Sequence, residues 1–362
     1  MLCAAALATA APLPQQIDDA SFWRMVKDFS EVGGSFSAEN FVSNEPNFQW
    51  VLTRLNAVTK PGGAYLGVGP EQNFTYIAAL KPDIAFITDI RRQNLVQHLM
   101  YKAIFEMSAD RADFLSILLS RKRPAGLTES STTERLFNAY GSSPTDAQLA
   151  KKNVQAIEDL LVKKHGFTLD ARDLETLEHV HHIFELYGLE TGYGSNLKTV
   201  DFTNGKGHNG NFSTILTTID DRGNNRTFLA TEANFRIVKD LEGRNLIVPI
   251  VGDFGGGHAL KSIAGYLTQH DSRVSAFYVS NVEQYLFQNN PTARNGGADQ
   301  FYENLAMLPL DRTSTFIRSA ARANVKEPYE GFVSLLGSMT ETLAAFKQTG
   351  FSSLRDVLEL SR

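Results

Sequence analysis

The sequence predicts an α/β fold in which a mostly parallel sheet is divided by a large helical insertion between the second and third core strands. Three observations support this prediction. A unit of strand, glycine turn, helix and strand occupies residues 64–88, and a similar unit occupies residues 246–279. Between them, residues 124–188 follow the apolar spacing of helices almost throughout. Such alternation of strands and helices is typical of parallel sheets.

These patterns divide the chain into six segments. Residues 17–29 and 40–55 show helical spacing, residues 192–211 form a polar, glycine-rich loop, and residues 329–360 again follow a helical pattern. Pro249 lies inside the first apolar run of the second unit, which indicates an edge strand or a bulge. The predicted segments are a leader or partial signal peptide (1–16), N-terminal helices (17–62), the first half of the core (63–122), the helical insertion with its loop (123–212), the second half of the core (213–325) and C-terminal helices (326–362).

The first residues allow two interpretations. The segment Leu2–Ala11 is small and apolar, and Ala8–Ala10 fits the small-x-small pattern before a signal cleavage site, but no positively charged n-region precedes it. The segment is therefore either the end of a longer signal peptide on a protein exported to the periplasm, or a small-residue leader on a cytoplasmic protein. Cys3 is the single cysteine, so no disulfide forms within the chain and cysteine usage does not decide the compartment.

Charge and hydropathy exclude two classes of partner. The net charge is −5 at pH 7 and the pI is near 5.9, whereas nucleic-acid-binding domains carry a basic footprint. No apolar run reaches the roughly 18 residues of a membrane span, so no transmembrane segment is expected. We therefore expect a small-molecule substrate and no nucleic-acid partner. The oligomeric state does not follow from the sequence.

The first glycine turn, GVGPEQN over residues 67–73, follows a short apolar run and opens a helix. Glycines let the backbone bend sharply and approach a ligand closely, and the start of a helix offers free N–H groups. We therefore expect Gly67, Gly69, Glu71 and Asn73 to contact a ligand. The alternative is a turn that only connects the strand to the helix.

Asp89 lies twenty residues after Gly69, at the carboxyl end of the next predicted strand. In Rossmann-like folds an acid at this place accepts hydrogen bonds from ribose hydroxyls. Gln72 replaces the third glycine of the pyrophosphate fingerprint, which favours a ligand without phosphate, such as S-adenosylmethionine, over NAD. Arg91 stands beside the acid and is expected to bind an anionic group of the ligand. For the neighbouring Arg92, a solvated helix start is the simpler interpretation.

The second unit offers further candidates at its strand ends. Asp253 stands in a second glycine turn and is expected to contact a base or a substrate amine, unless that turn is only a flexible connection. Asn281 and Tyr285 follow the last strand of this unit, share a helix face at i, i+4 spacing and are expected to reach the substrate. Glu283 is the best-placed general base by spacing. A capping box of Ser280 with Glu283 is the structural alternative.

A histidine-rich segment within the insertion is a further candidate for chemistry. His179 and His182 share one face of the predicted helix, and Glu178, His182 and Glu185 share another. Imidazole and carboxylate groups on one face are potential metal ligands. The spacing matches no standard zinc signature, so we assign no metal site and expect a solvated helix surface.

Three stretches, AYLGVGPEQNFTYI, FITDIRRQN and AFYVSNVEQYL, resemble strand motifs of class I S-adenosylmethionine-dependent methyltransferase-like proteins. They are most similar to an uncharacterised bacterial family with GVGPEQN and SNVEQYL signatures. The resemblance covers the two α/β units and not the insertion. It implies that the first glycine turn faces the amino-acid part of the cofactor, that Asp89 binds the ribose, that Asp253 lies near the adenine and that residues 281–285 lie near the acceptor. The acid that usually precedes the first glycine in such proteins is Leu66 here.

The sequence thus supports three functions. The first is an S-adenosylmethionine-dependent transferase acting on an unknown small acceptor, in which Asp89 fixes the cofactor and the crevice beside Asn281, Glu283 and Tyr285 positions a nucleophile. The second is an exported Rossmann-like protein that binds a small molecule without catalysis. The third is an NAD-dependent oxidoreductase, which Gln72 disfavours. Fold alone does not separate these chemistries.

Overall fold

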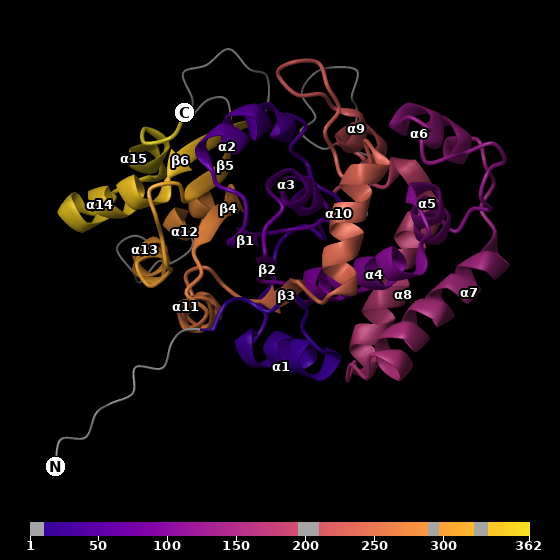
Figure 1. Ribbon diagram of the computed structural model, residues 1–362, viewed down its shortest axis with the longest axis horizontal. Coiled ribbons are helices and arrows are strands. Elements are labelled where there is room, and N and C mark those ends of the chain that lie inside the picture. Colours follow the sequence, from indigo (N-terminus) through magenta and orange to yellow (C-terminus); the bar gives the residue numbers. More distant parts are fainter. Residues whose placement is uncertain (1–10, 195–209, 289–296, 322–331) are drawn as a thin grey trace.

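The computed structural model describes residues 11–194, 210–288, 297–321 and 332–362. Its centre is a six-stranded sheet in the order β3-β2-β1-β4-β5-β6, in which neighbouring strands are parallel except for β5 and β6. Figure 1 shows the sheet in the middle of the molecule, with helices of the insertion on one side and the C-terminal helices on the other. The strands are β1 (Ala64–Gly67), β2 (Ile84–Asp89), β3 (Ile247–Val251), β4 (Val274–Ser280), β5 (Thr315–Ala321) and β6 (Phe332–Ser338).

Helices precede the first strand, connect the successive strands from β1 to β5 and follow the last strand. Before β2 these are α1 (Asp19–Phe29), η1 (Phe48–Val51), α2 (Leu52–Val58) and α3 (Gln72–Leu80). Between β2 and β3 they are α4 (Arg92–Met107), α5 (Arg111–Leu119), α6 (Thr133–Gly141), α7 (Ala147–Glu158), η2 (Asp159–Lys164), α8 (Ala171–Tyr187), η3 (Gly188–Glu190), α9 (Phe212–Thr217) and α10 (Glu232–Gly243). After β3 they are α11 (Ala259–Gln269), α12 (Val282–Gln288), α13 (Ala298–Leu305), α14 (Met339–Thr349) and α15 (Leu354–Leu358).

The α/β fold with a mostly parallel sheet is confirmed, as is the helical insertion between β2 and β3. The first predicted unit is β1–α3–β2, whose strands pair in parallel from Ala64 opposite Ile84. Strands β1, β2 and β3 are buried along their whole lengths, which explains their unbroken apolar sequences. Pro249 lies in β3 at one end of the sheet, so the predicted edge position is confirmed.

The order of the strands changes direction at β1. The chain adds β2 and then β3 on one side of β1, and β4, β5 and β6 on the other. The connections after β1 and β4 therefore lead away from each other, and a crevice forms between them at the carboxyl ends of the strands. Open α/β sheets bind ligands at this position.

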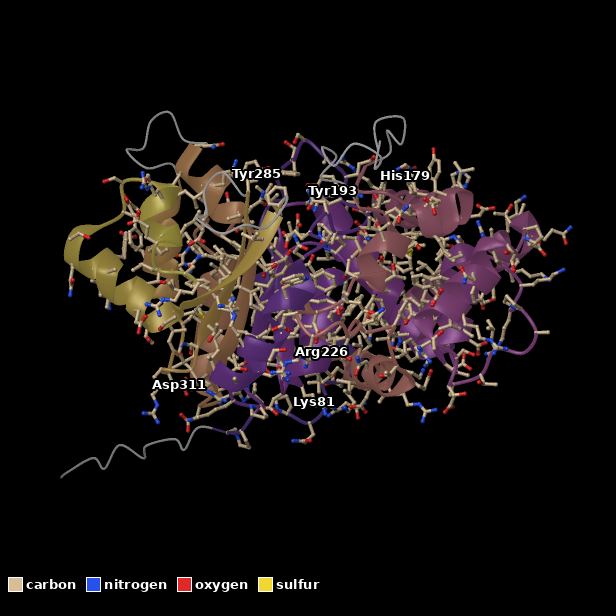
Figure 2. The ribbon with its side chains drawn as sticks, turned by 90° about the horizontal axis from the view of Figure 1, so that it is seen from above. Lys81, His179, Tyr193, Arg226, Tyr285 and Asp311 are labelled. Carbon is tan, nitrogen blue, oxygen red and sulfur yellow. The ribbon has the colours of Figure 1, made fainter. Side chains whose placement is uncertain are left out.

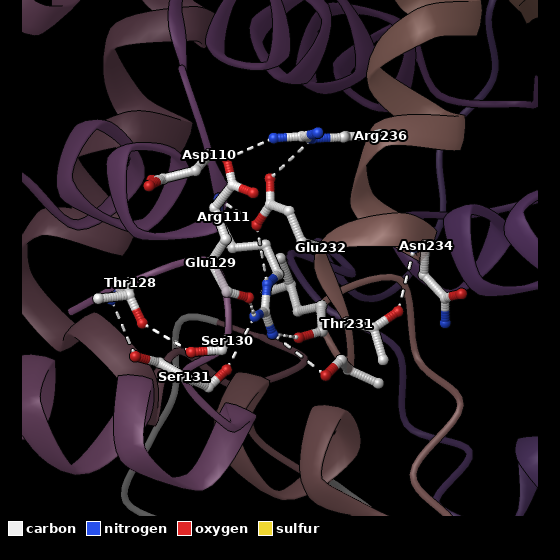
Figure 3. Close-up of polar contacts among 12 residues, drawn as sticks. Asp110, Arg111, Thr128, Glu129, Ser130, Ser131, Thr231, Glu232, Asn234 and Arg236 are labelled. Atoms are coloured by element: carbon white, nitrogen blue, oxygen red, sulfur yellow. Dashed lines mark hydrogen bonds and ion pairs between the residues drawn. The ribbon is translucent and has the colours of Figure 1, made fainter.

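A buried arginine joins distant parts of the connection between β2 and β3, as Figure 3 shows. Arg111, which is 2% exposed, begins α5 and pairs with Glu232 in the first turn of α10 through an Nε–Oε2 contact of 3.1 Å. Its guanidinium also donates to the backbone carbonyls of Glu129 and Ser131 before α6, and to those of Leu229 and Ala230 before α10. One buried side chain thus satisfies several carbonyl groups that the irregular backbone leaves unpaired.

Two expectations about regular structure are wrong. Residues 40–47 are not helical, and the expected helix begins only at Phe48 as η1 and α2. Residues 332–338 form the strand β6 instead of helix, and β5 before it was also not expected. Burial alternates along β6, the period-2 pattern of a strand with one covered face, and pairing with β5 outweighs its helical composition.

Two further expectations fall mainly on residues outside the described ranges. Most of the predicted polar loop, residues 195–209, lies outside the described residues, as do residues 1–10 of the leader. In the part of the chain that is described, no helix has both the length and the apolar character needed to cross a membrane.

Candidate functional site

A cavity of about 410 Å³ opens at the carboxyl ends of β1, β2, β3 and β4. Its volume lies within the roughly 300–1,000 Å³ typical of small-molecule sites. Figure 2 shows Tyr193 and Tyr285, which line the cavity, at one edge of the molecule, and Lys81 and Asp311, which precede β2 and β5, at the opposite edge. The cavity therefore lies where the strand order predicts a ligand site.

The glycine turn after β1 contributes one wall of the cavity. Gly69 lines it with a φ of +76°, a left-handed conformation that favours glycine. Asn73 lies behind the turn and donates its side-chain amide to the carbonyls of Val68, Gly69 and Pro70 at 2.8–3.0 Å. A Cβ at Gly67 would come within 1.9 Å of Asn73 Oδ1. Gly67 and Asn73 thus shape the turn without lining the cavity.

His98 supports the same turn from α4, and its role was not found from the sequence. Its Nε2 lies 2.9 Å from the Gly69 carbonyl oxygen, which can only accept, so Nε2 carries the proton. Burial lowers the pKa of His98 to about 4, and the ring is therefore neutral near pH 7. A lone histidine in an apolar helix offers no sequence signal for this contact.

Asp89 and Arg91 form a buried ion pair in the cavity wall. The Arg91 Nε lies 2.9 Å from Asp89 Oδ1 and its Nη2 lies 2.8 Å from Oδ2, and the Arg91 N–H also donates to Oδ1. Arg91 is therefore neutralised by Asp89. Arg92 points elsewhere and pairs with Asp173 of α8 at 2.6 Å, so only the first of the two arginines lines the cavity.

Asp253 reaches the cavity from the turn after β3. Its side chain is exposed and accepts a hydrogen bond from the Gly255 N–H at 2.9 Å, while its own N–H donates to Glu31 at 2.7 Å. Phe254 lines the cavity beside it. The structure thus brings Asp253 and Asp89, more than a hundred positions apart in the sequence, to one cavity.

The end of β4 supplies the opposite wall. Asn281 and Tyr285 line the cavity, whereas Glu283 does not. The Glu283 carboxylate accepts from Arg318 of β5, with Nε–Oε2 at 2.6 Å, and from the Tyr302 hydroxyl at 2.7 Å. This pair is almost fully buried and joins α12 to the sheet, so the side chain proposed as a general base has structural partners and no access to the cavity.

The segment 35–45 supplies a further wall and lines the cavity with Ser35, Phe36, Asn40, Ser43, Asn44 and Glu45. It is held there by hydrogen bonds to α4 and to the residues just before that helix. Gln97 Nε2 donates to the Phe41 carbonyl at 2.6 Å, and the Gly34 N–H donates to the Ile90 carbonyl at 2.8 Å. Sequence reasoning missed this wall because the segment was expected to be partly helical.

Glu45 is the charged side chain that this segment brings to the cavity. It is 3% exposed, and its Oε2 accepts from Gln72 Nε2 at 3.0 Å while its Oε1 accepts from the Ser280 hydroxyl. Burial raises the pKa of Glu45. Ser280 itself has a φ of +51°, a strained backbone at the strand end. The hydroxyl expected to form a capping box with Glu283 instead binds Glu45.

The predicted Glu71 lies behind the cavity, not in its lining. It is fully buried and accepts the Ser43 N–H at 3.0 Å. Burial raises the pKa of Glu71 to about 7. Of the residues predicted to contact a ligand, the lining thus contains Gly69, Asp89, Arg91, Asp253, Asn281 and Tyr285, and it leaves out Gly67, Glu71, Asn73 and Glu283.

The cavity is acidic and aromatic. Among the described residues that line it, the charged ones are Glu45, Asp89, Arg91 and Asp253, and the single cation is already paired with Asp89. The aromatic rings are those of Phe36, Tyr193, Phe254, Tyr278 and Tyr285. Such a lining suits a neutral or cationic ligand with an aromatic part, because carboxylates and ring faces attract positive charge.

The histidine-rich segment lies on α8, away from the cavity lining. His179 lies 3.1 Å from Glu39, and His182 lies 3.0 Å from Glu185, both as exposed or half-exposed pairs. His181 is buried and its Nε2 lies 3.1 Å from the Ile117 carbonyl oxygen. Within the described ranges, no group of three or more His, Cys, Asp or Glu side chains is arranged to hold a metal ion.

Comparison with known proteins identifies one family. A family match spans residues 40–360, which includes all six strands and nearly all of the residues that line the cavity. No curated protein matches the chain. The chain belongs to the family described as Domain of unknown function (DUF7790).

Proposed function

We propose that this protein has a Rossmann-like core that binds S-adenosylmethionine in the cavity and transfers its methyl group to a small acceptor. The proposal rests on the charged residues that line the cavity and on their place in the sheet. Three carboxylates, those of Glu45, Asp89 and Asp253, surround a cavity at the point where the strand order reverses, and the single arginine beside them is neutralised. Nucleoside ligands bind at this point in open α/β sheets.

Each part of this cofactor finds a matching group in the lining. Arg91 occupies three of the roughly four lone-pair positions of Asp89, so Oδ2 can accept one ribose hydroxyl, and the exocyclic amine of adenine is a donor to Asp253. Phe254 lines the cavity beside Asp253 and adds apolar surface at the place proposed for the base. The positive sulfonium suits a site rich in carboxylates and aromatic rings.

The same lining disfavours NAD. A pyrophosphate needs cationic side chains or free backbone N–H groups to balance its charge. Here the described lining has more carboxylates than cations, and Arg91 donates to Asp89. The start of α3 is also occupied by the buried side chains of Glu71 and Gln72. Pyrophosphate would therefore lie against negative charge.

Catalysis in this proposal consists mainly of positioning. The bound cofactor supplies an electrophilic methyl group on a sulfonium. Asn281 and Tyr285 offer an amide and a hydroxyl at the end of β4, where they orient the acceptor towards that group. The segment 35–45 contributes a wall of the cavity. Glu283 has no part in proton transfer, because Arg318 and Tyr302 occupy its carboxylate.

Isothermal titration calorimetry with S-adenosylmethionine tests the proposal, with NAD as the competing ligand. We expect saturable binding of the first and none of the second. Asp89→Asn should weaken binding by about 10-fold or more, because a hydrogen bond to a charged group is lost. Asp173→Asn is the matched control, since Asp173 pairs with Arg92 in the same way but outside the cavity. Absence of binding to the folded native protein would overturn the proposal.

A second function uses the same cavity without chemistry. In that case the protein binds a small molecule and transfers nothing, which the placement of Glu283 outside the cavity favours. Formation of S-adenosylhomocysteine in the presence of a panel of small acceptors distinguishes the two functions. Binding without any turnover over the whole panel would support the binding protein.

A further inference from the structure

Glu45 is a buried carboxylate in the cavity wall that has no cationic partner among the described residues. Three other buried carboxylates named above have one: Asp89 pairs with Arg91, Glu232 with Arg111 and Glu283 with Arg318. Glu71 also lacks one among the described residues, but it lies behind the cavity and does not line it. Glu45 accepts from the neutral groups of Gln72 and Ser280, and its other hydrogen-bond neighbours, Tyr278 and Ser319, are neutral as well. The carboxylate thus lines the cavity with neutral hydrogen-bond partners but without a counter-charge among the described residues.

The titratable groups that face Glu45 bring no positive charge either. They are phenols from four different elements or loops, whose pKa values its charge helps to raise: Tyr65, Tyr76, Tyr193 and Tyr278. A buried charge without a partner is costly, and proteins normally pair it. A cationic group of the ligand would supply the partner that the described part of the fold does not.

The position of Glu45 indicates which part of a ligand it meets. Gln72 belongs to the first turn of α3 and Ser280 to the end of β4, so Glu45 lies between the glycine turn and β4. Asp89 and Asp253 lie on the other side of the glycine turn, at the ends of β2 and β3. A nucleoside held by those two acids would direct the rest of the ligand towards Glu45.

We propose that Glu45 binds a primary ammonium group of the ligand, which in S-adenosylmethionine is the amine of its amino-acid part. This inference rests on the function proposed above. Leu66, which precedes the glycine turn in the sequence, is apolar and buried, so β1 brings no acid to this end of the cavity. The carboxylate comes instead from the segment 35–45. This segment precedes β1 in the chain, and it lines the cavity at the carboxyl end of that strand.

Three ligands that share the same nucleoside test this inference by calorimetry. S-adenosylhomocysteine carries both the amine and the carboxylate, its decarboxylated analogue keeps only the amine, and methylthioadenosine lacks both. In the native protein we expect the two amine-bearing ligands to bind more tightly than methylthioadenosine. Glu45→Gln should weaken both of them by about 10- to 100-fold, the loss expected for a charged hydrogen bond, and should change methylthioadenosine by less than about 2-fold.

Glu71→Gln is the matched control. Glu71 is an equally buried carboxyl nearby, but it does not line the cavity, so this variant should bind all three ligands like the native protein. Glu45→Asp, which keeps the charge on a shorter side chain, should lie between the native protein and Glu45→Gln, and thermal unfolding confirms that each variant is folded.

The outcomes separate the two proposals. An equal loss of affinity for all three ligands, or no loss for any, would overturn the role of Glu45 and leave the proposed function standing. Loss of affinity for S-adenosylhomocysteine but not for the decarboxylated analogue would also overturn it. If none of the three ligands binds the native protein, the proposed function and this inference both fall.

Discussion

Two glutamates near the end of β4 differ in their surroundings but not in their burial. Glu45 and Glu283 are each 3% exposed. Glu283 faces Arg318 and holds α12 against β5, whereas Glu45 faces the cavity and accepts only from neutral groups. Equal burial therefore goes with different roles. A carboxylate that is paired with an internal cation contributes to the fold, and one that lacks such a partner can receive a charge from a ligand.

The same substitution in the two glutamates should change the free energy of unfolding by very different amounts. Glu283→Gln leaves the Arg318 guanidinium buried without a counter-charge, and we expect a loss of about 3–5 kcal/mol in the free energy of unfolding. Glu45→Gln leaves no charge unpaired and should change that free energy by less than about 1 kcal/mol. Urea denaturation followed by circular dichroism measures both.

A double variant provides the control for this comparison. Glu283→Gln combined with Arg318→Met removes both charges, so it should be more stable than the single Glu283→Gln variant. A loss below about 1 kcal/mol for Glu283→Gln alone would contradict the assignment of this pair to the fold.

Glu71 extends the comparison to a buried carboxyl that faces neither a cavity nor an arginine. Burial raises the pKa of Glu71 from 4.5 to about 7, so the folded state holds the proton more tightly than the unfolded chain. Its contribution to stability is therefore greatest below pH 4.5 and is lost as the pH rises to 7, by a free energy of the order of 3 kcal/mol. Glu71→Gln should not show this loss, so its stability relative to the native protein should increase over that range. Urea denaturation at pH 4.5 and pH 7.5 tests the sign, and a constant difference would contradict it.

Ligand affinity should depend on pH through Glu45. The pKa of Glu45 is raised by burial, and an ammonium group binds only to the ionised carboxylate. Affinity for S-adenosylhomocysteine should therefore fall as the pH drops through this raised pKa, by up to about 10-fold per pH unit. Methylthioadenosine should show no such dependence. Calorimetry across the acidic range compares the two ligands, and parallel pH profiles would argue against ion pairing at Glu45.

The smallest effect is expected for a substitution of His98. His98→Phe removes the donor to the Gly69 carbonyl and should lower the free energy of unfolding by about 1 kcal/mol and the ligand affinity a few-fold. His181→Phe is the matched control, because His181 is also buried and contacts a carbonyl, that of Ile117, but lies on α8 outside the cavity lining. It should lose stability without a change in affinity. Equal affinities of the two variants would show that the contact with Gly69 does not shape the site.

The residues of the candidate site that directly follow a strand could be predicted from the sequence. Asp89, Asp253 and Asn281 each follow an apolar run, and the carboxyl ends of parallel strands meet at one edge of a sheet. The sequence could not show which polar groups near that edge face the cavity. Arg91 and Arg92 are neighbours in the chain, yet one pairs within the cavity wall and the other reaches α8.

By itself the sequence determined the α/β class, the two glycine turns, the edge position of Pro249 and the insertion between β2 and β3, because these depend on local patterns of apolar residues, glycine and proline. Only the tertiary structure decided the surroundings of the two glutamates. A helix turns each successive side chain to a new direction, and the irregular segment that carries Glu45 has no periodicity, so their surroundings depend on packing between segments that are distant in the chain.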